Sequence, residues 1–198
     1  MEKRELIHEG KSRRLYATED PGLIVQEFKD EAAFLDGAEM AVIPGRGRVG
    51  TRMSDVVFRL LGRRGIPTHH VKLLSDNELL TRRLEMIRME LVVRNHAAAG
   101  FAARLGLPEG KPLVRPLVEF YYKDDELGDP MLAREHIREL GLAREEQVEE
   151  MAGLALRVNE ALLPFFESRE LELVDYKLEF GLREGRLTLG DEFSPDVC

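Results

Sequence analysis

Alternating hydrophobic and polar positions dominate the first 95 residues, and a period of two is typical of β-strands with one buried face. The predicted strands cover residues 5–10, 12–19, 22–30, 67–74, 78–86 and 89–95. Glycine and proline mark turns at residues 10–11 and 21–22. The strands are interrupted at residues 51–64, where Met53, Val57 and Leu60 recur at helical spacing and predict a helix.

The pattern changes after Asn95, where helical periods become more frequent. The predicted elements are a helix at residues 97–106, a strand at 116–123, a long helix at 144–168, and two strands with a turn at 171–193. The apolar stripe of the long helix consists of Val148, Met151, Ala155, Val158 and Leu162. Its spacing indicates a helix that packs one face against a core.

These elements predict an α+β protein with two lobes. We expect an antiparallel, β-rich N-terminal lobe at residues 1–92 and a mixed α/β C-terminal lobe at residues 93–198. Ligands bind preferentially in the cleft between such lobes, so we expect the functional site there.

The composition narrows the class of ligand. The chain has 198 residues, of which 43% are hydrophobic and 33% charged, as in ordinary globular proteins. Its net charge of −8 argues against a nucleic-acid partner. No apolar run reaches the roughly 18 residues that a membrane helix needs, so we expect no membrane partner. Basic residues are nevertheless dense at positions 11–14 and 46–64, which favours a small anionic ligand.

We expect a cytoplasmic protein from the first residues and from the cysteine count. The first ten residues, MEKRELIHEG, contain no apolar segment of the kind found in signal peptides. The single cysteine, Cys198, cannot form an intrachain disulfide and fits a reducing compartment. We expect this terminal thiol to be incidental, because no His or Asn pattern marks it as a nucleophile.

Two motifs that suggest known sites carry little weight. Residues 45–50, GRGRVG, match the G-x-G-x-x-G pattern, but the acidic residue expected about 20 positions later is missing. We interpret this segment as a flexible basic loop. His69 and His70 are adjacent, so on a strand they point to opposite faces and do not easily share one metal ion. We expect one of them to point inward and the other to lie in solvent.

The segment DYKLEF carries the strongest chemical signal. On a strand, Asp175, Lys177 and Glu179 share one face, and their mixed charge suits a cation together with phosphates. The second strand brings back Asp191, and the register decides where it points. A two-residue turn requires a bulge at Gly190 to place Asp191 on the charged face, whereas a three-residue turn places it there directly. In either case Glu179 and Asp191 can hold one Mg²⁺, with ATP phosphates completing the octahedron.

A second candidate for phosphate binding is the turn EGKSRR at residues 9–14. A glycine turn lets backbone N–H groups approach a phosphate, and Lys11 and Arg13 lie on one side of an extended chain. The arrangement is similar to the glycine-rich flap over the ATP phosphates in kinase-like sites.

Together these segments resemble the phosphoribosylaminoimidazole-succinocarboxamide synthase (SAICAR synthetase) family of purine biosynthesis. The matching runs follow the family's order along nearly the whole chain. They are EGKSRRLYATEDPGLIVQEFKD, GIPTHHVKLLSDNELL, ELVVRNHAAAGFAARLG, VEFYYKDDELGDP and LVDYKLEFGLREGRLTLGDEFSPD. The resemblance implies two α+β lobes with ATP and Mg²⁺ between them.

The activity that the resemblance implies is that of an ATP-dependent carbon–nitrogen ligase. ATP activates the carboxylate of 5-amino-4-carboxyimidazole ribotide, and L-aspartate attacks the acyl phosphate. The products are the succinocarboxamide, ADP and phosphate. The partners are therefore small-molecule substrates, and the resemblance also implies a homo-oligomer.

The resemblance assigns residues by matched position. The nucleotide-binding residues are Lys11, Arg13, Lys123 and Met86, with Arg13 in the place of a frequent lysine. The metal-binding residues are Glu179 and Asp191. The catalytic residues are Lys177 and Asp175, and the ribotide-binding residues are Arg94, Asp129, Asp196 and Gly100.

The sequence also departs from the family pattern. Gly100 stands where a ribotide-binding serine is expected, and Thr51 stands where asparagine is common. We expect the chain to lack the family's Arg- and Trp-containing C-terminal segment. These departures leave two alternatives open. One is a family member that joins an amino acid to a different carboxylate, and the other is a nucleotide-binding protein without ligase activity.

Overall fold

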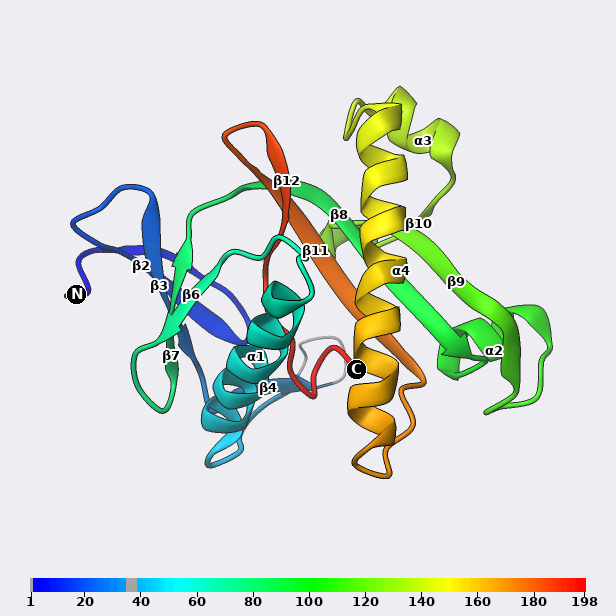
Figure 1. Ribbon diagram of the computed structural model, residues 1–198, viewed down its shortest axis with the longest axis horizontal. Helices are drawn as coiled ribbons and strands as arrows, with labels where there is room; N and C mark the ends of the chain where they lie inside the picture. Colours follow the sequence, from blue (N-terminus) through cyan, green and yellow to red (C-terminus); the bar gives the residue numbers. More distant parts are fainter. Residues whose placement is uncertain (1, 35–38) are drawn as a thin grey trace.

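The computed structural model describes residues 2–34 and 39–198. In these residues the strands form two five-stranded antiparallel sheets and a two-stranded ribbon (Figure 1). The first sheet has the order β1 (Leu6–Glu9), β2 (Arg13–Ala17), β3 (Leu23–Phe28), β7 (Glu78–Arg82) and β6 (His70–Leu73). The second has the order β10 (Met131–Leu132), β9 (Pro112–Tyr122), β8 (Glu85–His96), β11 (Asp175–Arg183) and β12 (Arg186–Leu189). The ribbon pairs β4 (Glu31–Phe34) with β5 (Glu39–Val42).

Helices cover one side of each sheet (Figure 1). Helix α1 (Arg46–Arg63) packs against β3, β6 and β7, and α4 (Glu145–Glu167) packs against β8, β9 and β12. The short helices are α2 (Ala99–Leu105), α3 (Arg134–Glu139) and the 3₁₀ helix η2 (Asp125–Leu127). Within the described ranges, no helix is long and apolar enough to cross a membrane.

The predicted α+β architecture is confirmed. The boundary expected between residues 92 and 93 falls inside β8, all of which belongs to the second sheet. We therefore propose that the lobes divide at residues 83–84, between β7 and β8. The lobes also meet at a backbone seam, because the N–H of His69 donates to the Leu189 carbonyl at 2.9 Å and the Leu189 N–H donates to the Pro67 carbonyl at 3.0 Å.

One large apolar core unites α1, α4 and the second sheet. The predicted long helix is confirmed as α4, and Arg144 and Ser168 cap its two ends. Strand β11 contributes Tyr176, Leu178 and Phe180 to this core, each at most 2% exposed. Because side chains alternate along a strand, the opposite face of β11 is left for Asp175, Lys177 and Glu179.

Helix α1 begins earlier than the sequence predicts. The interpretation of GRGRVG as a flexible loop is wrong, because residues 46–50 form the first turns of this helix. The carboxylate of Asp30 accepts the N–H groups of Gly45 at 3.1 Å and Gly47 at 2.9 Å, which satisfies donors at the helix N-terminus. A Cβ atom at Gly47 would lie 2.6 Å from the Phe28 carbonyl oxygen, so only glycine allows this close approach.

The β11–β12 hairpin has the two-residue turn. Its paired residues include Phe180 with Leu189 and Leu182 with Leu187. Glu184 and Gly185 adopt φ values of 51° and 75°, as a type I′ turn requires. The paired residues end at Leu189, the Gly190 N–H still donates to the Glu179 carbonyl at 2.9 Å, and Asp191 then adopts a left-handed conformation with φ 62°. This turn of the backbone, rather than the predicted bulge at Gly190, brings Asp191 to the charged face.

Candidate active site

The cleft between the two sheets contains a cavity of about 610 Å³, within the range of small-molecule sites. Both sheets, the turn after β1 and the segment after β12 line it. Its apolar lining includes Ile7, Leu15, Ile24, Leu84 and Ile87. Most of the predicted site residues also line it, namely Lys11, Arg13, Met86, Lys123, Asp129, Lys177, Glu179 and Asp191. The fold thus gathers in one cavity residues from both ends of the sequence.

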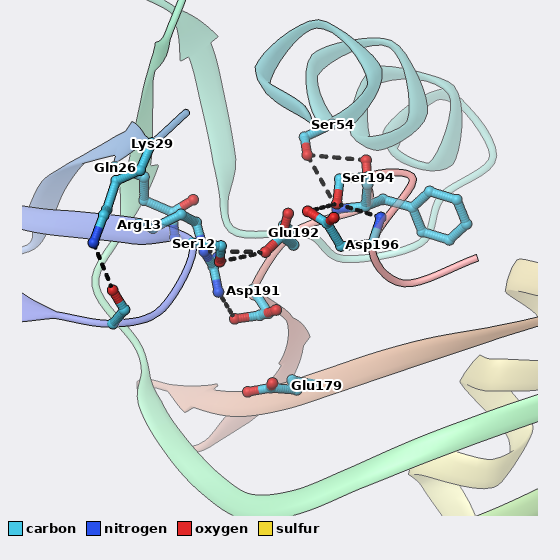
Figure 2. A network of polar contacts seen from close by, with 12 residues as sticks. Ser12, Arg13, Gln26, Lys29, Ser54, Glu179, Asp191, Glu192, Ser194 and Asp196 are labelled. Atoms are coloured by element: carbon cyan, nitrogen blue, oxygen red, sulfur yellow. Dashed lines mark hydrogen bonds and ion pairs between the residues drawn. The ribbon is translucent and has the colours of Figure 1, made fainter. Parts of the chain in front are cut away.

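Glu179 and Asp191, whose side chains are 3% and 12% exposed, form a carboxylate pair at the charged side of this cavity (Figure 2). Burial and the charge of Asp191 raise the pKa of Glu179. Burial also acts to raise the pKa of Asp191, but Arg13 and Lys123 overcome it and lower that pKa to about 2. Arg13 forms an ion pair with Asp191, and Lys123 Nζ lies 2.5 Å from Glu179 Oε1. Each carboxylate is therefore neutralised by a cation from a different element.

The carboxylate pair has the donor chemistry that Mg²⁺ prefers. Magnesium in nucleotide sites is commonly held by one or two carboxylates together with phosphate oxygens and water. Among the residues that the structure describes, no group of three or more His, Cys, Asp or Glu side chains forms a complete metal site. Glu179 and Asp191 therefore fit a cation whose remaining ligands come from a bound phosphate.

Lys177 is the cation next to this pair. Its Nζ lies 2.7 Å from Glu90 Oε1 and 3.6 Å from Glu179 Oε1. Burial acts to lower the pKa of Lys177, but the two carboxylates raise it above its ordinary value, so the side chain stays protonated. Sequence reasoning missed Glu90. Side-chain alternation along its predicted strand places Glu90 on the same face as Arg94, and this could have indicated that Glu90 belongs to the charged face.

The cation-rich turn reaches across the cleft. Lys11 Nζ lies 2.9 Å from Asp125 Oδ1, so a residue next to the first sheet pairs with one between strands of the second. The pairing raises the pKa of Lys11 and lowers that of Asp125. Asp129 lies in the same loop, and its Oδ1 accepts the N–H of Asp124 at 2.8 Å. The turn therefore has the position of a flap over the cavity.

Glu192 ties this turn to the segment after β12, and sequence reasoning missed it. Ser12 Oγ donates to Glu192 Oε1 at 3.0 Å, and Arg13 Nε lies 3.4 Å from the same oxygen (Figure 2). The next residue is anchored as well, because the Phe193 N–H donates to Ser54 Oγ in α1 at 3.1 Å. The contact of Ser12 with Glu192 joins residues 180 positions apart, and that of Ser54 with Phe193 joins residues 139 positions apart. No local sequence pattern indicates contacts at such separations.

Arg94 and Asp175 form a second charged group outside the cavity lining. Arg94 Nη1 lies 2.5 Å from Asp175 Oδ2, and Arg94 Nε lies 2.7 Å from Glu119 Oε2. Burial acts to lower the pKa of Arg94, but Glu119 and Tyr121 raise it. Asp175 lies two residues before Lys177 on the same face of β11, so this group continues the charged face beyond the cavity.

Gly100 and Asp196 also lie outside the cavity lining. Gly100 is exposed in the first turn of α2, and a Cβ there would meet no atom within 4 Å. Asp196 Oδ2 accepts from Arg46 Nη2 at 2.7 Å and lines a separate groove of about 980 Å³ beside α1. The Val197 carbonyl accepts the Lys177 N–H at 2.8 Å, so the segment with Asp196 runs beside β11.

The two adjacent histidines are both largely buried. His69 is 2% exposed, and burial lowers its pKa to about 3. The side chain of His70 is 6% exposed, and its Nε2 lies 2.9 Å from Asp55 Oδ1. The expectation that one histidine lies in solvent is wrong, because α1 covers His70 with Asp55. Among the described residues they contribute to no metal cluster.

The fold and the cleft define an α+β protein with a charged site between two lobes, suited to a phosphate-bearing ligand. A family model described as SAICAR synthetase matches residues 6–198. Two similar proteins are the phosphoribosylaminoimidazole-succinocarboxamide synthases of Coprothermobacter proteolyticus and Bacillus cytotoxicus. They are 48% and 46% identical to this chain, and the matches cover all of it and 84% and 83% of those proteins.

Solved structures agree with the sequence comparison. The enzyme of the same name from Ehrlichia chaffeensis is 37% identical with a TM-score of 0.95, over 98% of this chain and 84% of that one. A SAICAR synthetase in complex with ADP is 39% identical with a TM-score of 0.93, over 98% of this chain and 82% of that one. The chain therefore belongs to the SAICAR synthetase family.

Proposed function

We propose that this protein is an ATP-dependent carbon–nitrogen ligase of purine biosynthesis. It joins L-aspartate to 5-amino-4-carboxyimidazole ribotide and forms SAICAR, ADP and phosphate. The observation that carries the proposal is the cavity in which Lys177, Glu179 and Asp191 meet Lys11 and Arg13. Family membership and the relative that was solved with ADP support the same activity.

The proposed reaction has two steps. A carboxylate oxygen of the ribotide attacks the γ-phosphorus of ATP, and the bond from that phosphorus to the oxygen that leaves with ADP breaks. The amine of aspartate then attacks the acyl carbon, loses a proton and expels phosphate, which carries away the carboxylate oxygen. Negative charge gathers on the transferring phosphoryl group, and fixed cations stabilise it best in a cleft that excludes water.

The residues of the cavity fit these steps. We assign Lys11 and Lys123 to the phosphates, Arg13 to the ion pairs that hold the carboxylates beside them, and Met86 to the nucleotide, because all four line the cavity. Glu179 and Asp191 would hold Mg²⁺, which when bound orients the phosphates and offsets their charge. Lys177 stays protonated beside them and is placed to stabilise the reacting carboxylate and phosphoryl group.

We assign the ribotide to the charged group that continues beyond Lys177. Arg94 and Asp175 form its paired charges, and Asp129 and Asp196 lie on the loops that flank the face. The open space at Gly100 leaves room for a ligand group where the family pattern has a serine hydroxyl. Bound L-aspartate must direct its amine toward the ribotide carboxylate, because the amide forms there.

The test is ADP release with Mg²⁺, L-aspartate and the ribotide, supplied singly and together. The proposal expects release only when all three are present. Lys177→Met should abolish it, whereas Lys111→Met, which changes an exposed lysine of the second lobe, should leave it unchanged. Turnover with another carboxylate alone would favour a ligase of different specificity. ADP binding without turnover on any carboxylate would favour a nucleotide-binding protein.

A homo-oligomeric state and a cytoplasmic location complete the proposal. Both rest on the family resemblance, and the single cysteine is consistent with the second. Sedimentation equilibrium of the purified chain tests the oligomeric state, and a single species at the monomer mass of 22.6 kDa would contradict it.

A further inference from the structure

We propose that Glu192 is a positioning residue that accepts Arg13 when a divalent cation takes Asp191. In this exchange the Arg13 guanidinium moves from the Asp191 carboxylate to the Glu192 carboxylate. The divalent cation then takes the place of the guanidinium at Asp191. The inference rests on the proposed function, because it requires Glu179 and Asp191 to hold a cation together with nucleotide phosphates.

The first observation is the place of Arg13 between two acids. Its Nη2 forms an ion pair with Asp191 Oδ1, and its Nε lies 3.4 Å from Glu192 Oε1. The three side chains are 15%, 12% and 5% exposed, so the arrangement is largely shielded from water although it lines the cavity. Arg13 thus already contacts both acids, with a close contact to Asp191 and a looser one to Glu192 (Figure 2).

The second observation is unused hydrogen-bonding capacity on the loose side. Arg13 Nε and Glu192 Oε2 are both buried, and in the described structure neither has a hydrogen-bond partner. A buried donor and a buried acceptor without partners each destabilise the fold. A rotation of the guanidinium toward Glu192 would satisfy both, and it would release Asp191 at the same time.

The third observation is a contrast with Lys123, which neutralises the other carboxylate. Lys123 is 44% exposed, so it can leave Glu179 for solvent or for a phosphate. Arg13 has less freedom to leave, because its side chain is only 15% exposed and lies between Asp191 and Glu192. A buried guanidinium without a partner strongly destabilises the fold. When a divalent metal ion binds Asp191, Arg13 therefore requires a second buried acceptor. Glu192 is in place to be that acceptor.

Glu192 is also held still, as an acceptor of this kind must be. Ser12 Oγ donates to it at 3.0 Å, and the Ser12 carbonyl in turn accepts the Lys29 N–H at 2.9 Å. On the other side Phe193 is anchored to α1 through Ser54. Because these contacts fix Glu192, the exchange keeps the turn at residues 10–13 in place over the cavity while the cation enters.

The direct test is a crystal structure of the wild-type chain with ADP and Mn²⁺. The expected structure has Mn²⁺ on Asp191, Arg13 more than 4 Å from Asp191, and Arg13 Nε within about 3 Å of a Glu192 oxygen. Arg13 still paired with Asp191, or turned into the cavity with Glu192 left unpaired, would overturn the inference.

The solution test is Mn²⁺ binding in the presence of ADP, followed by electron paramagnetic resonance. Glu192→Gln should weaken Mn²⁺ binding about tenfold, because the neutral amide cannot compensate the displaced guanidinium. Glu160→Gln, on the exposed side of α4, is the matched control and should change nothing. In an Arg13→Lys background, where the flexible amine can leave for the cavity as Lys123 can, Glu192→Gln should weaken binding less than about threefold.

The outcomes separate the inference from the proposed function. A tenfold loss that persists in the Arg13→Lys background would mean that Glu192 acts on the metal directly, and it would overturn the exchange. Equal binding in wild type and Glu192→Gln would also overturn it, while leaving the nucleotide site intact. If the wild-type chain bound neither ADP nor Mn²⁺, the proposed function would fail first and the inference with it.

Discussion

Lys123 Nζ lies 2.5 Å from Oε1 of Glu179, although the two residues belong to segments that flank β8 on opposite sides. A cation next to β9 therefore neutralises a buried carboxylate of β11. The carboxylates of this site are already paired with protein cations before a nucleotide and its metal bind. Binding at this site is an exchange of ionic partners, and the predictions below follow from that exchange.

Glutamine at position 179 tests the metal side of the exchange. Glu179→Gln keeps the shape of the side chain but removes the charge, so metal-dependent ADP formation should fall about 100-fold or more. The folded state should lose little, because burial and Asp191 already disfavour the ionised form of Glu179 and raise its pKa. Steady-state kinetics and thermal unfolding measure the two effects. Equal losses in activity and stability would contradict the metal assignment.

The contact between Lys11 and Asp125 tests the flap. The side chains are 62% and 73% exposed, so the pair should contribute well under about 1 kcal/mol to folding. Lys11→Met should leave the free energy of unfolding nearly unchanged but weaken ADP binding several-fold, because a phosphate contact is lost. Asp125→Asn is the matched variant, and it should bind ADP at least as tightly as wild type, since it frees Lys11. Weaker binding in both variants would mean that the ion pair itself shapes the site.

Local sequence patterns predict some of these features and not others. The stripe of α4, the turn at Gly185 and the shared face of Lys177 and Glu179 depend on spacing within one or two neighbouring elements, which a sequence displays. The early start of α1 depends on Asp30, which caps the helix from a distant segment. Glu192 gains its role only from Ser12 and Arg13, at the other end of the chain, so its function could not be predicted from local pattern.

Acid unfolding tests the charge of Asp191. The pKa of its carboxyl is lowered from 3.8 to about 2, so its ionised form stabilises the fold above about pH 4 and this contribution is lost as the pH falls toward 2. Asp191→Asn should lower the free energy of unfolding at neutral pH by about 2 kcal/mol, and the difference from wild type should shrink between about pH 4 and 2. Urea titrations across this range measure it. A difference that stays constant down to the lower pH would contradict the assignment.

The hydroxyl of Tyr176 provides a test of stability that is separate from the site. It donates to the Ala155 carbonyl at 3.1 Å inside the core, between β11 and α4. Tyr176→Phe should lower the free energy of unfolding by about 1 kcal/mol, or somewhat more because a buried carbonyl loses its side-chain donor. ADP binding should stay as in wild type, because Tyr176 lies on the apolar face of β11. Urea unfolding and calorimetric titration with ADP measure the two, and a matching loss of ADP affinity would show that the core and the site are coupled.

Isotope transfer shows whether this chain activates a carboxylate by phosphorylating it. The ribotide, labelled with ¹⁸O in its carboxylate, is incubated with the protein, ATP, Mg²⁺ and L-aspartate, and the released phosphate is analysed by mass spectrometry. Each phosphate formed should contain one ¹⁸O atom, because the carboxylate oxygen leaves with the phosphoryl group. Phosphate without label, formed in step with ADP, would mean that ATP is hydrolysed without activating the ribotide, and the proposed function would be wrong.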